Sequence, residues 1–186
     1  MSKNLTWLIV AGVVALAAFW CVSQYNKMVV AEENVEKQWS QVENVYQRRA
    51  DLVPQLVGAV KGYAKHESDV FNGVAEARAK LAGSTTVEEK AEGYNQMQSA
   101  LGRLLAIAEN YPELKSNTNF QQLQDELAGT ENRIAVARKR YNDSVRIFNT
   151  QIKMFPSSIV AGRLDFEKKS YFEIAESSKT APKVEF

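Results

Sequence analysis

The stretch LTWLIVAGVVALAAFWCVSQYN, residues 5–26, contains no charged residue. At about 1.5 Å per residue, its apolar body is long enough to cross the roughly 30 Å hydrocarbon core of a bilayer as an α-helix. A helix is expected because, in lipid, only helices and closed barrels satisfy all their backbone hydrogen bonds. The stretch therefore predicts a transmembrane anchor over residues 1–27, with the lipid bilayer as its partner.

The residues at the two ends of this stretch are those typical of a membrane anchor. Trp7 lies near one end, and Trp20 and Tyr25 lie near the other, where aromatic rings favour the headgroup boundary. Lys27 follows and can extend its ammonium group to water. A cleaved secretory signal is the alternative, because residues 15–17 (Ala-Leu-Ala) resemble a small-residue cleavage site. The apolar run continues past them, which favours a permanent anchor.

The composition argues against several classes of function. The net charge is +1, so there is no overall attraction to nucleic acid. Cys21 is the only cysteine, so an intrachain disulfide is impossible. His66 is the only histidine, and zinc, di-iron and serine-hydrolase sites need more histidines or other motifs. We therefore predict no enzyme, no catalytic residue, no metal and no cofactor.

Behind the anchor, the hydrophobic pattern is that of long amphipathic helices over residues 28–156. Apolar residues recur every three or four positions, which is the period of one helix face. The first stripe contains Val35, Trp39, Val42, Tyr46, Val53, Leu56, Val60, Tyr63, Val70, Val74, Ala77 and Leu81. Pro54 interrupts it, and a proline removes a backbone donor, so we expect a kink or break near Leu52.

Local end signals divide the rest of this region. The sequence Thr86-Val-Glu-Glu89 matches a capping box that starts a second helix, which Pro112 ends. A third helix starts after the polar stretch 115–119, which offers N-caps, and ends before Pro156. The predicted fold class is all-α, an N-terminal transmembrane helix followed by an antiparallel bundle of three to four long helices. Residues 157–186 lose this periodicity and are predicted to form a C-terminal tail, partly disordered, that docks through its aromatic residues.

Charged residues occupy several positions where the stripes call for apolar ones. These are Arg49, Glu67, Glu131 and Arg138. Because an unpaired charge in a bundle core is costly, each should find an opposite partner, either as Arg49–Glu131 or as Glu67–Arg138. We interpret these residues, with Asp51, as a structural polar cluster that sets helix register. A ligand site formed by Arg49, Asp51, Glu67 and Glu131 is the alternative.

Extended motifs resemble the LemA family. They are RRADLVPQLV (48–57), VKGYAKHE (60–67), AENYPELK (108–115), FQQLQ (120–124) and ENRIAVAR (131–138). The chain departs from the family pattern at Gln55, where Asn is usual, and at Asp165, where Gly is usual before the aromatic residue. The resemblance implies a bacterial membrane-anchored helical bundle, with a short external N-terminus and the bundle in the cytoplasm, and implies no established catalytic activity.

Two functional hypotheses follow. The first is a non-enzymatic scaffold at the bacterial inner membrane that self-associates as a homo-oligomer. Residues 11 and 15, both Ala, have the spacing that allows transmembrane helices to approach closely. The second is a membrane-tethered adaptor that recruits a partner protein through the bundle face or the C-terminal tail.

Overall fold

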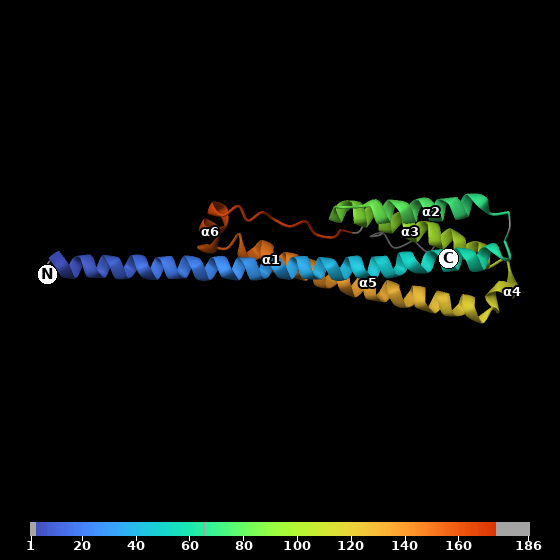
Figure 1. The fold of residues 1–186 in the computed structure, drawn as a ribbon, viewed down its shortest axis with the longest axis horizontal. Helices are drawn as coiled ribbons and strands as arrows, with labels where there is room; N and C mark the ends of the chain where they lie inside the picture. Colours follow the sequence, from blue (N-terminus) through green and yellow to red (C-terminus); the bar gives the residue numbers. More distant parts are fainter. Residues whose placement is uncertain (1–2, 65, 174–186) are drawn as a thin grey trace, which may run out of the picture. The chain divides into compact units, whose positions relative to one another are not determined.

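The structure of this chain is a computed structural model that describes residues 3–64 and 66–173. The described residues form helices and connecting segments, with no strand among them, which confirms the all-α class. Figure 1 shows the helices in chain order. They are α1 (Lys3–Lys61), α2 (Ser68–Gly83), α3 (Val87–Ala108), α4 (Pro112–Lys115), α5 (Thr118–Gln151) and α6 (Ser157–Arg163).

A kink or a break was predicted near Leu52; helix α1 continues through Pro54, so the break is wrong. A proline in a helix leaves the carbonyl four residues earlier without its usual donor. Here that carbonyl belongs to Ala50, and it accepts a hydrogen bond of 3.0 Å from Nε of Arg78 on α2. The chain leaves the helix after Lys61 instead, and α2 begins seven residues later at Ser68. A side chain distant in sequence thus replaces the donor that Pro54 lacks.

Contacts divide the chain into two compact units. Unit 1 consists of Met1–Trp39 with Tyr141–Ser170, and unit 2 consists of Ser40–Arg140 with the residues from Tyr171 onward. The first part of α1 and the last part of α5 therefore belong to unit 1, and the remainder of both helices belongs to unit 2. This division follows contacts alone and leaves the predicted domain boundaries (1–27, 28–156 and 157–186) a prediction.

In unit 1, the segment after α6 packs back on the helices. The Asn149 side chain donates to the Lys169 carbonyl and accepts from the Lys169 amide, both at 2.9 Å. The Lys169 ammonium also forms an ion pair with Glu32 on α1 at 2.6 Å. Asp165 has φ 54°, the left-handed conformation in which glycine is favoured and aspartate is tolerated. The ring of Phe166 nevertheless packs on Phe148, with centroids 6.3 Å apart, so this tail contact forms without the family's glycine.

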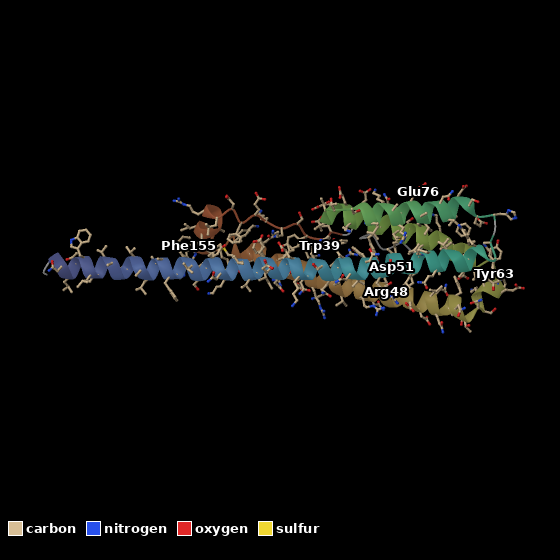
Figure 2. All side chains as sticks on the ribbon, viewed as in Figure 1. Trp39, Arg48, Asp51, Tyr63, Glu76 and Phe155 are labelled. Carbon is tan, nitrogen blue, oxygen red and sulfur yellow. The ribbon has the colours of Figure 1, made fainter. Side chains whose placement is uncertain are left out.

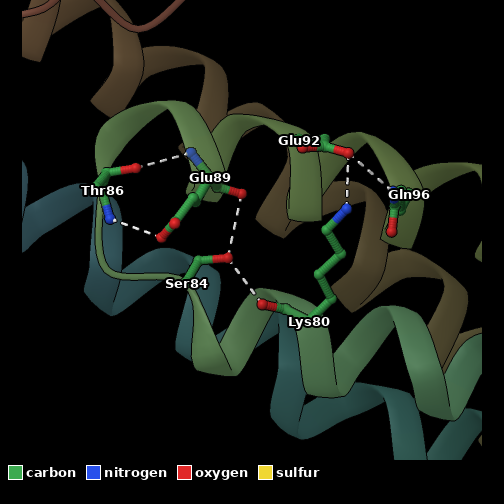
Figure 3. Close-up of polar contacts among 6 residues, drawn as sticks. All are labelled: Lys80, Ser84, Thr86, Glu89, Glu92 and Gln96. Atoms are coloured by element: carbon green, nitrogen blue, oxygen red, sulfur yellow. Dashed lines mark hydrogen bonds and ion pairs between the residues drawn. The ribbon is translucent and has the colours of Figure 1, made fainter.

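In unit 2, α2 and α3 form a helical hairpin through a three-residue turn. The predicted capping box is confirmed, because the Thr86 hydroxyl accepts from the Glu89 amide and the Glu89 carboxylate accepts from the Thr86 amide (Figure 3). The buried Ser84 hydroxyl also donates towards carbonyls of both helices, at 2.8 Å to Lys80 and 3.1 Å to Glu89. A side chain at Gly93 would approach the α2 backbone at 3.0 Å, so glycine allows the close helix contact.

Local signals also set the ends of the later helices. Helix α3 ends at Ala108, and Pro112 begins the short α4, where its missing amide costs nothing. The Asn117 carboxamide oxygen accepts from the amides of Asn119 and Phe120 at 3.0 and 3.2 Å. The polar stretch therefore supplies the N-terminal cap of α5, as predicted.

Candidate functional site

Arg49 is the most buried charged residue in the core of unit 2. Its side chain is 3% exposed. One terminal nitrogen, Nη1, forms an ion pair with the Glu131 carboxylate on α5, and Nη2 donates to Oε1 of Gln98 on α3 at 2.6 Å. Such partners are needed because an unpaired buried charge costs several kcal/mol. The guanidinium therefore connects α1, α3 and α5 at one point within unit 2.

Two stacked tyrosines lie beside this ion pair. The rings of Tyr46 and Tyr94 have centroids 4.9 Å apart and an interplanar angle of 24°. The Tyr94 hydroxyl donates to the Glu131 carboxylate. Burial and this hydrogen bond raise the pKa of Tyr94 above its usual value, and burial likewise raises the pKa of Tyr46. Both phenols are therefore neutral at physiological pH, and Glu131 accepts from one charged and one neutral donor.

Arg138 contacts aromatic faces. Its Cζ atom lies 4.2 Å from the ring centroid of Phe172 and 5.7 Å from that of Tyr94. Cation–π contacts of this kind contribute about 0.5–2 kcal/mol, depending on how far they are desolvated. Phe172 is itself buried and lies 6.1 Å from the Tyr46 ring. The tail therefore docks on unit 2 through Phe172, whereas Phe186 lies outside the described residues.

Asp51 and Glu67 lie apart from this cluster. Asp51 is exposed on α1 (Figure 2), where its carboxylate accepts from Nε2 of Gln47 at 2.8 Å. Glu67 is half-buried at the residue before α2. Among the described residues, no ion pair joins Glu67 to Arg138, the second of the two predicted pairs. The structure thus gathers three of the five predicted residues and places these two elsewhere.

The chemistry available to this cluster is recognition between helices. A buried guanidinium pairs well only when one particular turn of its helix faces the matching carboxylate, so such a pair can select one helix register. Within the part of the chain that the structure describes, no group of three or more His, Cys, Asp or Glu side chains is placed to hold a metal ion. His66, the only histidine, is exposed.

The predicted anchor residues lie on the first part of α1. Trp7, Tyr25 and Lys27 are exposed, and Trp20 is half-buried. None of the most apolar stretch of this helix is buried inside the protein. By length and composition, α1 is the one helix among the described residues that is long and apolar enough to cross a membrane. This helix fits a membrane protein.

Several partners in the cluster escaped the sequence analysis. Tyr46 and Tyr94 both lie at stripe positions, so they were counted as apolar residues in the sequence analysis. A buried tyrosine also has a hydroxyl that needs a hydrogen-bond partner, and this was not used. Gln98 lies four residues after Tyr94, hence on the same helix face, and that spacing was an available signal. Phe172 lies in a segment without periodicity, so no sequence signal indicated where it packs.

Comparisons with known proteins agree with these observations. The model of the LemA family matches residues 38–186. Magnetosome protein MamQ 2 of Paramagnetospirillum magneticum is 26% identical over 194 residues, covering 89% of this chain and 71% of that protein. Magnetosome protein MamQ of Magnetospirillum gryphiswaldense is 26% identical with the same coverage. Protein LemA of Metamycoplasma hominis is 24% identical, covering 85% of this chain and 73% of that protein.

Proposed function

This chain belongs to the LemA family, and from that premise we propose that it is a non-enzymatic membrane-anchored scaffold. Residues 5–26 cross the bacterial inner membrane once, and the helices behind them form an antiparallel bundle. The scaffold self-associates as a homo-oligomer. The relatives named magnetosome protein MamQ 2 and protein LemA carry names without a catalytic activity, which is consistent with a non-enzymatic role.

One observation carries the proposal, the exposed apolar part of α1. Its most apolar window is 0% buried, yet the same helix continues without a break to Lys61. A helix that is apolar on all sides and has no protein partner is expected in lipid or against other apolar helices. A continuous helix leading from such a segment connects the membrane span directly to the residues that follow it.

The buried cluster supports the scaffold over a ligand-binding role. Arg49 is 3% exposed, and its two terminal nitrogens are both engaged by protein side chains, those of Glu131 and Gln98. Asp51, which the ligand-site alternative requires, is exposed on α1 and accepts from Gln47. We propose that the cluster fixes the register of the helices, which a scaffold needs in order to present constant surfaces.

The test of self-association is the mass of the full chain in detergent. Light scattering corrected for bound detergent should give a multiple of the 20.9 kDa chain mass. If the span contributes, Ala11→Leu with Ala15→Leu should lower that mass, because larger side chains keep the helices apart. Val13→Leu, on another face of the same helix, is the matched control. A monomer at every concentration would overturn the scaffold and leave the adaptor hypothesis.

We further propose that the bundle lies in the cytoplasm, as the family resemblance implies. Cysteine labelling with a membrane-impermeant reagent in intact and opened cells tests this. Ser84 is a poor labelling site because it is buried and hydrogen-bonded. Gly83 is exposed and has open space around an added side chain, so Gly83→Cys in a Cys21→Ala background is the better choice. Labelling in intact cells would place the bundle outside.

A further inference from the structure

The turn and short helix after α5 expose an unusual set of apolar side chains. Met154, Phe155, Ile159 and Leu164 fall within eleven residues, and they keep between 50% and 80% of their maximal exposure. Figure 2 labels Phe155, the most exposed of them, at the turn that leads into α6. Single exposed apolar residues are ordinary, but a cluster of this kind marks an interaction surface. We refer to residues 154–164 as the apolar turn.

Helix α6 shows that this exposure is one-sided. Val160 and Ala161 are buried against unit 1, whereas Ile159 and Arg163 face outward. The helix therefore presents an apolar residue and a basic residue on its exposed face. Such a short amphipathic element is suited to lie at the boundary between water and an apolar medium, with its apolar side chains in that medium.

The position of the apolar turn relative to the span indicates that this apolar medium is the bilayer. Oγ of Ser157 donates to Oε1 of Gln24 at 3.3 Å, and the ring of Phe166 lies 6.0 Å from that of Tyr25. Gln24 and Tyr25 are at the end of the charge-free stretch. Residues 5–23 already cover about 28 Å as a helix, close to the hydrocarbon thickness. The apolar turn therefore lies at the level where the bilayer changes from hydrocarbon to headgroups.

The charges around the apolar turn fit the same partner. Lys27, Lys153 and Arg163 are exposed in unit 1, beside or within this segment. Their long side chains can reach anionic headgroups while the apolar residues enter the acyl region. Asp165 and Glu167 are the exposed acidic residues that follow. Lys27 directly follows the charge-free stretch, and Lys153 directly precedes the apolar turn.

We propose that the apolar turn inserts into the membrane interface and forms a second contact between this protein and the bilayer, in addition to the span. The inference rests on the proposed span over residues 5–26. A single helix can rotate and tilt in a membrane, whereas a helix with a second inserted contact at its side cannot do so freely. The turn would thus hold unit 1 in one orientation on the membrane surface.

Fluorescent labels at three positions test this with the full chain in vesicles of equal parts phosphatidylcholine and phosphatidylglycerol. In a Cys21→Ala background, Gly162→Cys places the label on the apolar turn while all its apolar side chains remain, because the space around Gly162 is open. Val14→Cys reports the hydrocarbon, and Lys37→Cys, at an exposed position on α1 about 20 Å beyond Gln24, reports water. Nitroxides attached to the lipid chains quench labels that enter the bilayer.

We expect quenching at Gly162→Cys to be at least twice that at Lys37→Cys. Adding Phe155→Glu and Ile159→Glu should reduce it to the Lys37→Cys level, with unchanged circular dichroism, whereas Phe155→Leu should retain it. If Val14→Cys is quenched and Gly162→Cys behaves like Lys37→Cys, the second contact is refuted and the span stands. If Val14→Cys itself is not quenched, the span fails, and the inference fails with it.

Discussion

Replacing Glu131 by alanine should destabilise this protein more than replacing Arg49 by methionine, although both changes break the same ion pair. The reason is the difference in exposure, 3% for the Arg49 side chain and 40% for that of Glu131. After Arg49→Met, the remaining carboxylate is partly in water and keeps the Tyr94 hydroxyl as a donor. After Glu131→Ala, the remaining guanidinium is buried.

The magnitudes follow from what each variant leaves behind. In Glu131→Ala, Arg49 keeps the neutral Gln98 oxygen, while its Nε already lacks a hydrogen-bond partner among the described residues. Stranding a buried charge costs about 3–5 kcal/mol. In Arg49→Met, a side chain of similar length keeps the packing and loses hydrogen bonds worth about 1–2 kcal/mol. The double variant removes the stranded charge, so it should cost about the same 1–2 kcal/mol as Arg49→Met alone, which gives a favourable coupling of about 3–5 kcal/mol in a double-mutant cycle.

The assay is chemical denaturation of the full chain in detergent micelles, followed by circular dichroism. Glu131→Gln is the control, because it keeps an acceptor oxygen for Arg49 and removes only the charge. It should fall between wild type and Glu131→Ala. This prediction would be refuted if Arg49→Met and Glu131→Ala lost equal amounts of unfolding free energy, or if their losses simply added in the double variant. Either result would mean that Glu131 does not compensate a buried charge on Arg49.

Four further predictions concern backbone conformation and helix ends. Arg78→Met should cost about 1–2 kcal/mol by leaving the carbonyl freed by Pro54 without a donor, and less in a Pro54→Ala background, where the amide returns. Thr86→Ala should cost about 1 kcal/mol of unfolding free energy through the lost cap. Backbone hydrogen bonds from residues 85 and 86 lower the pKa of Glu89. The ionised carboxylate therefore contributes fully to the stability of the fold above the ordinary pKa of 4.5, and this contribution is lost as the pH falls through the lowered pKa. The stability difference between wild type and Glu89→Gln should accordingly shrink in acid. Asp165→Gly should stabilise by about 0.5 kcal/mol, because relief of the left-handed strain outweighs the entropy gained by the unfolded chain.

Each of these has a measurement that can contradict it. Denaturation midpoints of the full chain in detergent give all the free energies. An equal cost of Arg78→Met with and without Pro54 would show that the proline carbonyl is not the reason for the effect. A stability difference for Glu89→Gln that persists unchanged into acid would exclude its lowered pKa as the cause. A lower midpoint for Asp165→Gly would mean that the aspartate side chain stabilises this conformation.

The helical class and several helix ends were predictable from the sequence, because they depend on residues within one or two turns of each other. The charge-free stretch, the three-to-four spacing of apolar residues and the Thr86–Glu89 box are all of this kind. The cap at Asn117 belongs to the same group. Such features are stabilised by neighbours along the chain, so the tertiary structure does not need to be known.

The choice between the two predicted ion pairs required the tertiary structure. Both were equally consistent with stripe positions, and Arg49 and Glu131 are 82 residues apart in the chain. Their meeting depends on which faces of α1 and α5 approach within unit 2, which periodicity alone does not specify. The placement of Phe172 against Arg138 is of the same kind, since its segment has no periodic pattern.

Pro54 and Asp165 show the division between local and long-range determinants most clearly. Read locally, the proline predicts a broken helix, and the aspartate casts doubt on the tail contact. The structure keeps the helix intact because Arg78, on another helix, donates to the carbonyl that the proline left free. It keeps the tail contact because aspartate tolerates the left-handed backbone at residue 165 and Phe166 has rings to pack against. Local sequence signals indicated most of the helices and the segment apolar enough for lipid, but not α6 (Ser157–Arg163), which lies in the predicted tail. Packing between distant residues decided where local irregularities are compensated and which charges are paired.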